Sequence, residues 1–175
     1  MKKEVKIKNI LASLYELSQM VKSKSIGLSK EMEKTRILLL RIFEFNLFSI
    51  FQYDYLERRL LPVYMYGDPF NLVDAVNFRL GKGATGGCLS HKKSLLICNL
   101  GREKTYERFF VKSFLAVPII FNAENIGVIV MGSFKVNQYD ISDRFLLELS
   151  APLIGNIILK ERFNLQKNNE IEEEK

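Results

Sequence analysis

The residues best suited to covalent chemistry in this 175-residue chain are two cysteines, Cys88 and Cys98, and a single histidine, His91. Zinc sites are built from clusters of Cys and His, and three such residues are too few for one. His91 has no assignable nucleophile and orienting acid, so it fits a surface loop better than a general base. We therefore predict no catalytic residue and no metal site, and we interpret both thiols as small buried hydrophobes in a reducing compartment.

A glycine-rich segment offers a second kind of chemistry, since residues 81–86 fit the pattern G-x-G-x-x-G of dinucleotide-binding folds. That fold requires a long helix directly after the glycines, and here the run after Gly87 reaches only His91 before two lysines and a strand-like stretch. A phosphate-binding P-loop requires a lysine where Gly87 stands. We therefore predict a tight turn in which the glycines provide positive φ angles.

A third group of residues is suited to binding rather than to catalysis. Aromatic residues recur at helical spacing between residues 102 and 113, which predicts a short amphipathic helix. Such side chains can stack on a flat ligand, although a stripe at this spacing is more often plain core. The candidate ligand-binding residues are Phe51, Thr85, Tyr106, Phe109, Phe110 and Ser113.

Two helices are expected before the sheet. Apolar residues with the a/d rhythm of a narrow packing seam predict an amphipathic helix within residues 1–27; they are Ile7, Ile10, Leu14, Leu17 and Val21. This seam spans only two heptads, so it should pack on its own domain, on a second copy, or on both. Ser25 and Gly27 interrupt the helix, and Ser29 is placed to cap a second one.

Strand patterns fill the middle of the chain. Residues 46–53 and 59–66 are rich in aromatic and aliphatic residues and are separated by a polar stretch, which predicts a β-hairpin. Pro62 cannot donate a ladder hydrogen bond, so the second strand should lie at an edge or carry a bulge. Three more strands are expected at 94–100, 114–121 and 126–134, the last two joined by a tight turn at 122–125.

A long helix is expected to close the chain. Asp140 is placed as its N-cap with Asp143 at the third helical position, and Pro152 should kink the helix. Its apolar stripe comprises Leu146, Leu149, Leu153, Ile154, Ile157 and Ile158. Residues 161–175 form a polar tail whose end, from residue 168, we expect to be frayed or disordered.

The net charge of +6 bears on possible partners. Residues 1–41 hold 10 Lys/Arg and 4 Asp/Glu, so the whole surplus lies on the N-terminal helices. Such a surplus usually marks a solvated helix face, and nucleic-acid binding would need a clustered basic stripe with a reading element. No secretory segment and no apolar run of membrane-spanning length is present, so we expect a cytoplasmic protein with neither nucleic-acid nor membrane partners.

The order of these elements resembles the GAF family over residues 28–160. The stretches that carry the resemblance are 79–87 with 92–97, 114–119, 126–130 and 139–147. The resemblance implies an α+β fold, with a mainly antiparallel sheet, terminal helices on one face, and a ligand pocket under short helices or loops on the other. We thus divide the chain into an N-terminal helix (1–27), a GAF-like domain (28–160) and a tail (161–175).

Functions within the family differ, and this sequence departs from several of them. Some members reduce free methionine sulfoxide with a nucleophilic cysteine in the glycine-rich turn, where Thr85 stands here; Cys88 lies three residues later, and residues 102–113 contain no cysteine. The lid-region cysteine and histidine of chromophore-binding members are missing. Of the pattern of cyclic-GMP-binding members, only fragments remain at Lys135 and Asp143.

The resemblance and the residues together predict a regulatory module rather than an enzyme. A small molecule, such as a cyclic nucleotide or a metabolite, would bind in the pocket and signal through the terminal helices to a second copy of the chain or to a partner signalling protein. No cofactor is identified. The alternatives are a ligandless dimerisation protein and a thiol-dependent free methionine sulfoxide reductase.

Overall fold

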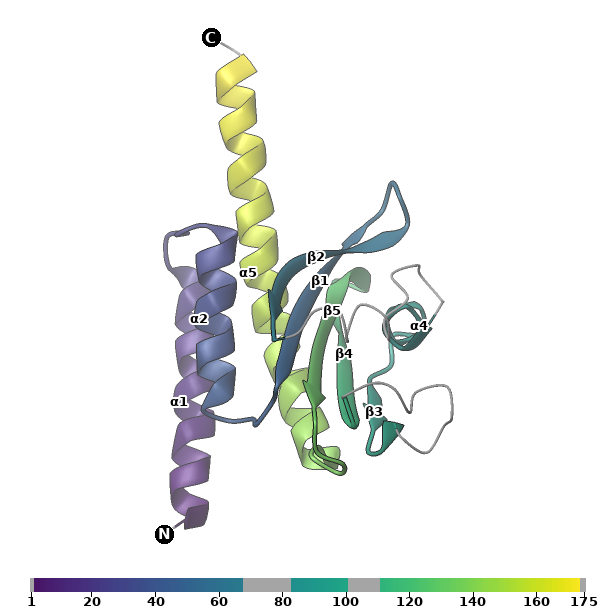
Figure 1. Cartoon of the computed structure of the whole chain (residues 1–175). Coiled ribbons are helices and arrows are strands. Elements are labelled where there is room, and N and C mark those ends of the chain that lie inside the picture. The colour runs from purple at the N-terminus through teal and green to yellow at the C-terminus, as the bar shows by residue number, and fades with distance from the viewer. Residues whose placement is uncertain (1, 68–82, 101–110, 174–175) are drawn as a thin grey trace.

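The computed structural model describes residues 2–67, 83–100 and 111–173, and its centre is a five-stranded antiparallel sheet in the order β2-β1-β5-β4-β3. Three helices cover one face of the sheet and a short helix covers the other (Figure 1). This is the α+β, GAF-like arrangement expected from the sequence. The elements are α1 (Lys2–Lys22), α2 (Leu28–Leu40), β1 (Leu47–Asp54), β2 (Arg59–Tyr66), α4 (Gly83–His91), β3 (Leu95–Ile97), β4 (Ser113–Phe121), β5 (Glu124–Ser133) and α5 (Ile141–Glu173).

The predicted hairpin is confirmed as β1 and β2, and Pro62 behaves as its chemistry requires. Strand β2 lies at the edge of the sheet, and the register between β1 and β2 shifts where Ile50 pairs with Tyr64 and Phe51 with Pro62. The extra residue, Val63, is therefore bulged opposite β1. Pro62 has no N–H to donate to a neighbouring strand. At an edge and next to a bulge, this missing hydrogen bond does not interrupt the pairing of the sheet.

The larger core lies between the sheet and the terminal helices, which we call the helix side. Strand residues that alternate toward this side, such as Phe48, Ile50, Leu115 and Ile129, pack against the buried stripe of α5. At Gly155 of α5 an added Cβ would lie 2.6 Å from Ile119 Cγ2 of β4, so glycine permits the close approach of helix to strand.

Helix α5 begins as predicted but ends later. Asp143 N–H donates to Asp140 Oδ1 at 3.0 Å, and Asp140 N–H donates to Asp143 Oδ2 at 3.1 Å, a reciprocal cap. The expectation of a frayed or disordered end from residue 168 is wrong, because the helix continues to Glu173. The segment after Gly155 contains neither Gly nor Pro and is rich in Glu and Lys, which favour helix.

Two other local expectations need correction. Ser29 does not cap α2, because the helix already begins at Leu28 with Gly27 as its N-cap, at φ 96°. The glycine-rich segment is largely helical rather than a turn, since α4 includes Gly86 and Gly87, while Gly83 at its start has φ 65°. Residues 81 and 82 lie outside the described residues.

No helix in the described parts of the chain is both long enough and apolar enough to cross a membrane.

Candidate functional site

Helix α4 covers the sheet face opposite the terminal helices, which we call the α4 side. It packs on β4 and β5 and contributes Cys88 and Leu89 to a second buried cluster. Strand residues of this cluster include Phe51, Phe114 and Val130. The layer is thus a separate apolar core of aromatic and aliphatic side chains, the usual lining of small-molecule sites.

In this layer, two hydroxyl groups have no hydrogen-bond partner among the residues that the structure describes. Thr85 of α4 is fully buried, and its Oγ1 makes no hydrogen bond to any described atom. Ser49 of β1 is also buried with an unpartnered Oγ, and by strand alternation it shares the face of Phe51. A buried polar group without a partner costs roughly 1–3 kcal/mol, so each such group calls for an explanation, such as a ligand or water.

The structure places the candidate ligand-binding residues in different parts of the fold. Phe51 and Thr85 both lie on the α4 side. Ser113 is the first residue of β4 instead of the end of a helix; it alternates with Leu115 onto the helix side, and its Oγ donates to the backbone oxygen of Lys135 at 2.8 Å. The remaining three, Tyr106, Phe109 and Phe110, lie outside the described residues, as does most of the helix expected over 102–113.

Sequence reasoning missed Ser49. The sequence does show a single hydroxyl residue in the apolar run 47–51, two positions from Phe51. Residues two positions apart in a strand point to the same face of the sheet. The alternation alone could not show which face of the sheet Ser49 would lie on, because residues on both faces of β1 are apolar. Only the position of α4 assigns Ser49 to the α4 side.

The two cysteines differ sharply in environment. Cys88 is buried in α4, and this burial raises the pKa of its thiol to about 12. Reactive cysteines are accessible and have a lowered pKa, which is the opposite condition. Cys98 is exposed, contrary to the expectation that both thiols are buried; its Sγ lies 3.9 Å from the backbone oxygen of Tyr139.

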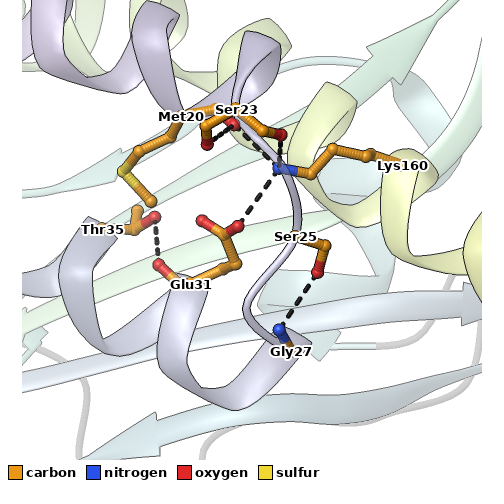
Figure 2. Close-up of polar contacts among 7 residues, drawn as sticks. All are labelled: Met20, Ser23, Ser25, Gly27, Glu31, Thr35 and Lys160. Atoms are coloured by element: carbon orange, nitrogen blue, oxygen red, sulfur yellow. Dashed lines mark hydrogen bonds and ion pairs between the residues drawn. The ribbon is translucent and has the colours of Figure 1, made fainter.

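On the helix side, a polar anchor ties the three terminal helices together (Figure 2). The ammonium of Lys160 in α5 lies 3.1 Å from Glu31 Oε1 in α2, and it donates to the backbone oxygens of Met20 at 2.8 Å and Ser23 at 3.3 Å. The side chains are 17% (Lys160) and 2% (Glu31) exposed. Because the pair is largely desolvated, its geometry must be kept for the helices to stay packed.

The outer surfaces of two terminal helices remain apolar. Helices α1 and α5 pack together and run in the same direction, and the C-terminal part of α5 extends past the other helices (Figure 1). Each carries exposed apolar residues four positions apart. They include Leu149 of the expected α5 stripe and Ile7 of the predicted seam, which was expected to pack on its own domain, on a second copy, or on both. The residues are Ile7, Leu11 and Tyr15 on α1, and Ile141, Phe145 and Leu149 on α5, all between 51% and 66% exposed.

A sheet with helical layers of this kind defines a GAF-type domain, and the comparison of sequences agrees. A family model described as GAF domain matches residues 38–159, well over half of the chain. The chain therefore belongs to the GAF domain family. Among proteins of curated function, none matches the sequence.

Solved structures with the same fold have different functions. A free methionine-R-sulfoxide reductase from Neisseria meningitidis, in complex with its substrate, superposes with a TM-score of 0.73 at 16% identity, covering 89% of this chain and 91% of that one. The GAF domain of an Acinetobacter phosphoenolpyruvate-protein phosphotransferase gives 0.70 at 22% identity, covering 89% and 96%. The reduced form of fRMsr from Staphylococcus aureus gives 0.69 at 18% identity, covering 85% and 94%. At these identities the likeness concerns the fold.

Proposed function

We propose that this GAF domain is a regulatory module that binds a small molecule on the α4 side and signals through the terminal helices to a second copy of the chain. The observation that carries the proposal is the pair of buried, unpartnered hydroxyls of Ser49 and Thr85 within an otherwise apolar layer. A ligand whose surface is largely apolar, with one or two polar groups, would match that layer and satisfy a hydroxyl. Candidate ligands are cyclic nucleotides, whose flat base has apolar faces and polar edge groups, and other small metabolites with a flat apolar part.

The output is proposed to pass through α1 and α5. Apolar side chains exposed at four-residue spacing on two packed helices mark an interaction surface more often than a solvated one. A ligand can bias this surface only if it binds the two helix arrangements with different affinity, because equal affinity shifts no equilibrium. We therefore expect ligand binding and self-association to be thermodynamically coupled.

The ligand proposal is tested by titrating the purified chain with cyclic nucleotides and small metabolites, using isothermal calorimetry and thermal shift. We expect a saturable ligand whose affinity falls at least about tenfold in Thr85→Val, the loss of one hydrogen bond to a bound ligand. Ser90→Ala is the matched control, since Ser90 is an exposed hydroxyl on the same helix that donates to the Gly87 oxygen. Absence of both heat and thermal stabilisation across the panel would refute ligand binding.

Self-association is tested separately by light scattering across micromolar concentrations. We expect a dimer that Leu149→Glu and Leu11→Glu convert to monomer, because a charge in an apolar interface is costly. Leu56→Glu in the β1–β2 turn is the control, since Leu56 is 96% exposed and this turn lies away from α1 (Figure 1). A wild-type monomer throughout would contradict the pairing, and a dimer whose dissociation constant no ligand of the panel changes would favour the ligandless interaction protein.

A thiol-dependent reductase of free methionine sulfoxide is the second candidate, supported by the fold likeness to two such enzymes. The buried thiol of Cys88, with its raised pKa, weighs against it because the thiolate is the nucleophile. The test is turnover of free methionine sulfoxide by wild type, Cys88→Ser and Cys98→Ser. Turnover that is lost in either variant would replace the regulatory proposal with the enzymatic one.

A further inference from the structure

A pocket of about 460 Å³ lies on the helix side, between strand β4, the first turns of α5, and the residues that follow α4. This volume is within the range of small-molecule sites. The pocket exists because β3 pairs with β4 only along Phe114–Ala116, so from Val117 onward the edge of β4 that faces away from β5 has no paired strand among the described residues. Neither Ser49 nor Thr85 is among the residues that line it.

The polar lining of this pocket is mostly cationic. Lys92 and Lys93 enter it from the end of α4, and Arg144 enters from α5, against one carboxylate, Glu148. The ammonium of Lys92 is held in place, donating to the backbone oxygen of Ala123 at 2.5 Å. Three cations and one anion leave a surplus of two positive charges in a concave site, which attracts anions.

The single carboxylate is already engaged. Glu148 Oε1 accepts a hydrogen bond from Ser94 Oγ at 2.6 Å and lies 3.7 Å from Arg144 Nε, beyond hydrogen-bond distance. Arg144 Nε is buried and donates no hydrogen bond to any described atom. A buried guanidinium N–H without an acceptor is costly, and an anion seated in the pocket would supply that acceptor.

We infer that this pocket is an anion site, which takes a small molecule through a phosphate or carboxylate group held by Arg144 and Lys93. Arginine suits both groups because its planar donors match two oxygens at once. The bound group would contact the end of α4, strand β4 and α5 together. Such a ligand stabilises the docking of α5 on the sheet, independently of any ligand on the α4 side.

The inference is tested with inorganic phosphate and with succinate, titrated against the full chain at constant ionic strength and followed by thermal shift and calorimetry. We expect saturable binding of at least one of them. We expect Arg144→Gln to weaken it at least about tenfold, as for the loss of a charge-assisted hydrogen bond. Saturation by phosphate alone assigns a phosphate ligand, and saturation by succinate alone assigns a carboxylate.

Three variants keep the result interpretable. Arg59→Gln makes the same change at a half-exposed arginine paired with Glu57 on the hairpin, and it should bind like wild type. Lys93→Gln alters an exposed residue and should weaken binding even if Arg144→Gln fails to fold. Thr85→Val should leave anion binding unchanged, which separates this site from the α4 side. Binding of neither anion, or equal binding by wild type, Arg144→Gln and Lys93→Gln, would overturn the inference.

Discussion

The two faces of the central sheet are filled by different means. On the helix side, polar contacts join separate elements: Lys160 links α5 to α2 and to the end of α1, and Arg36 of α2 donates to Tyr64 of β2 at 3.0 Å. On the α4 side, a short helix covers an apolar layer in which the hydroxyls of Ser49 and Thr85 are unpartnered. Hydrogen bonds and an ion pair thus connect the elements on the helix side, whereas on the α4 side two buried hydroxyls have no partner among the described residues.

The contrast is one of degree, because the helix side also holds unpartnered buried groups, such as Ser13 Oγ and Tyr139 Oη. What distinguishes it is the desolvated ion pair of Glu31 and Lys160, which has no counterpart among the described residues of the α4 side. A buried pair resists rearrangement strongly once formed. We therefore expect substitutions in the Glu31–Lys160 pair to affect folding, and those of Thr85 and Cys88 on the α4 side to affect binding and reactivity.

Thiol reactivity gives the largest expected difference. With a pKa near 12, Cys88 holds about a thousandfold less thiolate at neutral pH than an ordinary cysteine. In the folded protein we expect a maleimide to label the exposed Cys98 and to leave Cys88 nearly unmodified, as measured by mass spectrometry over time. In denaturant both should label alike. Equal labelling in the folded state would mean that α4 opens, and it would strengthen the reductase alternative.

Breaking the polar anchor should give the largest loss of stability. Lys160→Met leaves the carboxylate of Glu31 buried without its cation, and we expect unfolding free energy to fall by about 3 kcal/mol in urea titrations. Lys135→Met is the control, because its ion pair with Glu44 is 71% and 76% exposed and should contribute little. The double variant Glu31→Met/Lys160→Met should recover much of the loss. If Lys160→Met behaves like Lys135→Met, the pair does not anchor the helices.

The sequence predicted the sheet better than it predicted the polar contacts within it. Alternating strands, the edge position of Pro62 and the Asp140–Asp143 cap depend on neighbours in the chain, so local chemistry is enough to find them. The Lys160 anchor joins residues more than a hundred positions apart, and no local pattern marks it. The pocket beside Arg144 likewise depends on where β3 ends.

The wrong predictions also have physical causes. Glycines usually oppose helix, yet residues 83–91 are helical because Cys88 and Leu89 are buried on the sheet, and tertiary packing outweighs propensity. The predicted apolar stripe of α5 included Leu149, but this side chain points outward. The faces of Ser49 and Ser113 could not be assigned because apolar residues occupy both sides of β1 and β4.

A matched pair of substitutions tests the two faces with the same chemistry. Thr35→Val on the helix side removes a hydrogen bond from a buried hydroxyl to the Glu31 backbone oxygen at 2.9 Å and should destabilise by about 1 kcal/mol. Thr85→Val on the α4 side removes an unpartnered hydroxyl and should leave stability unchanged or raise it by up to about 1 kcal/mol. Urea titrations of both variants check the sign. Equal destabilisation would show that Thr85 finds a partner in solution.

The smallest expected effect concerns pH and the contact of α2 with β2. Hydrogen bonds from Arg36 and Tyr64 lower the pKa of Glu33 from 4.5 to about 2. Because the folded pKa is depressed, the stabilisation is fully present above pH 4.5 and is lost as pH falls toward 2. Glu33 is 44% exposed, so solvent screening keeps the contribution small.

We expect Glu33→Gln to be slightly less stable than wild type at pH 7 and nearly equal to it at the acid end of that window, measured by urea unfolding at both pH values. Glu57→Gln is the matched control, because the Glu57 side chain is 58% exposed and paired with Arg59 on the hairpin. Its effect on stability should depend less on pH. A difference between Glu33→Gln and wild type that persists unchanged at low pH would mean that the carboxylate charge is not the cause. In that case the link between α2 and β2 would depend on side-chain packing, and the helix side would be less sensitive to charge than its buried ion pair suggests.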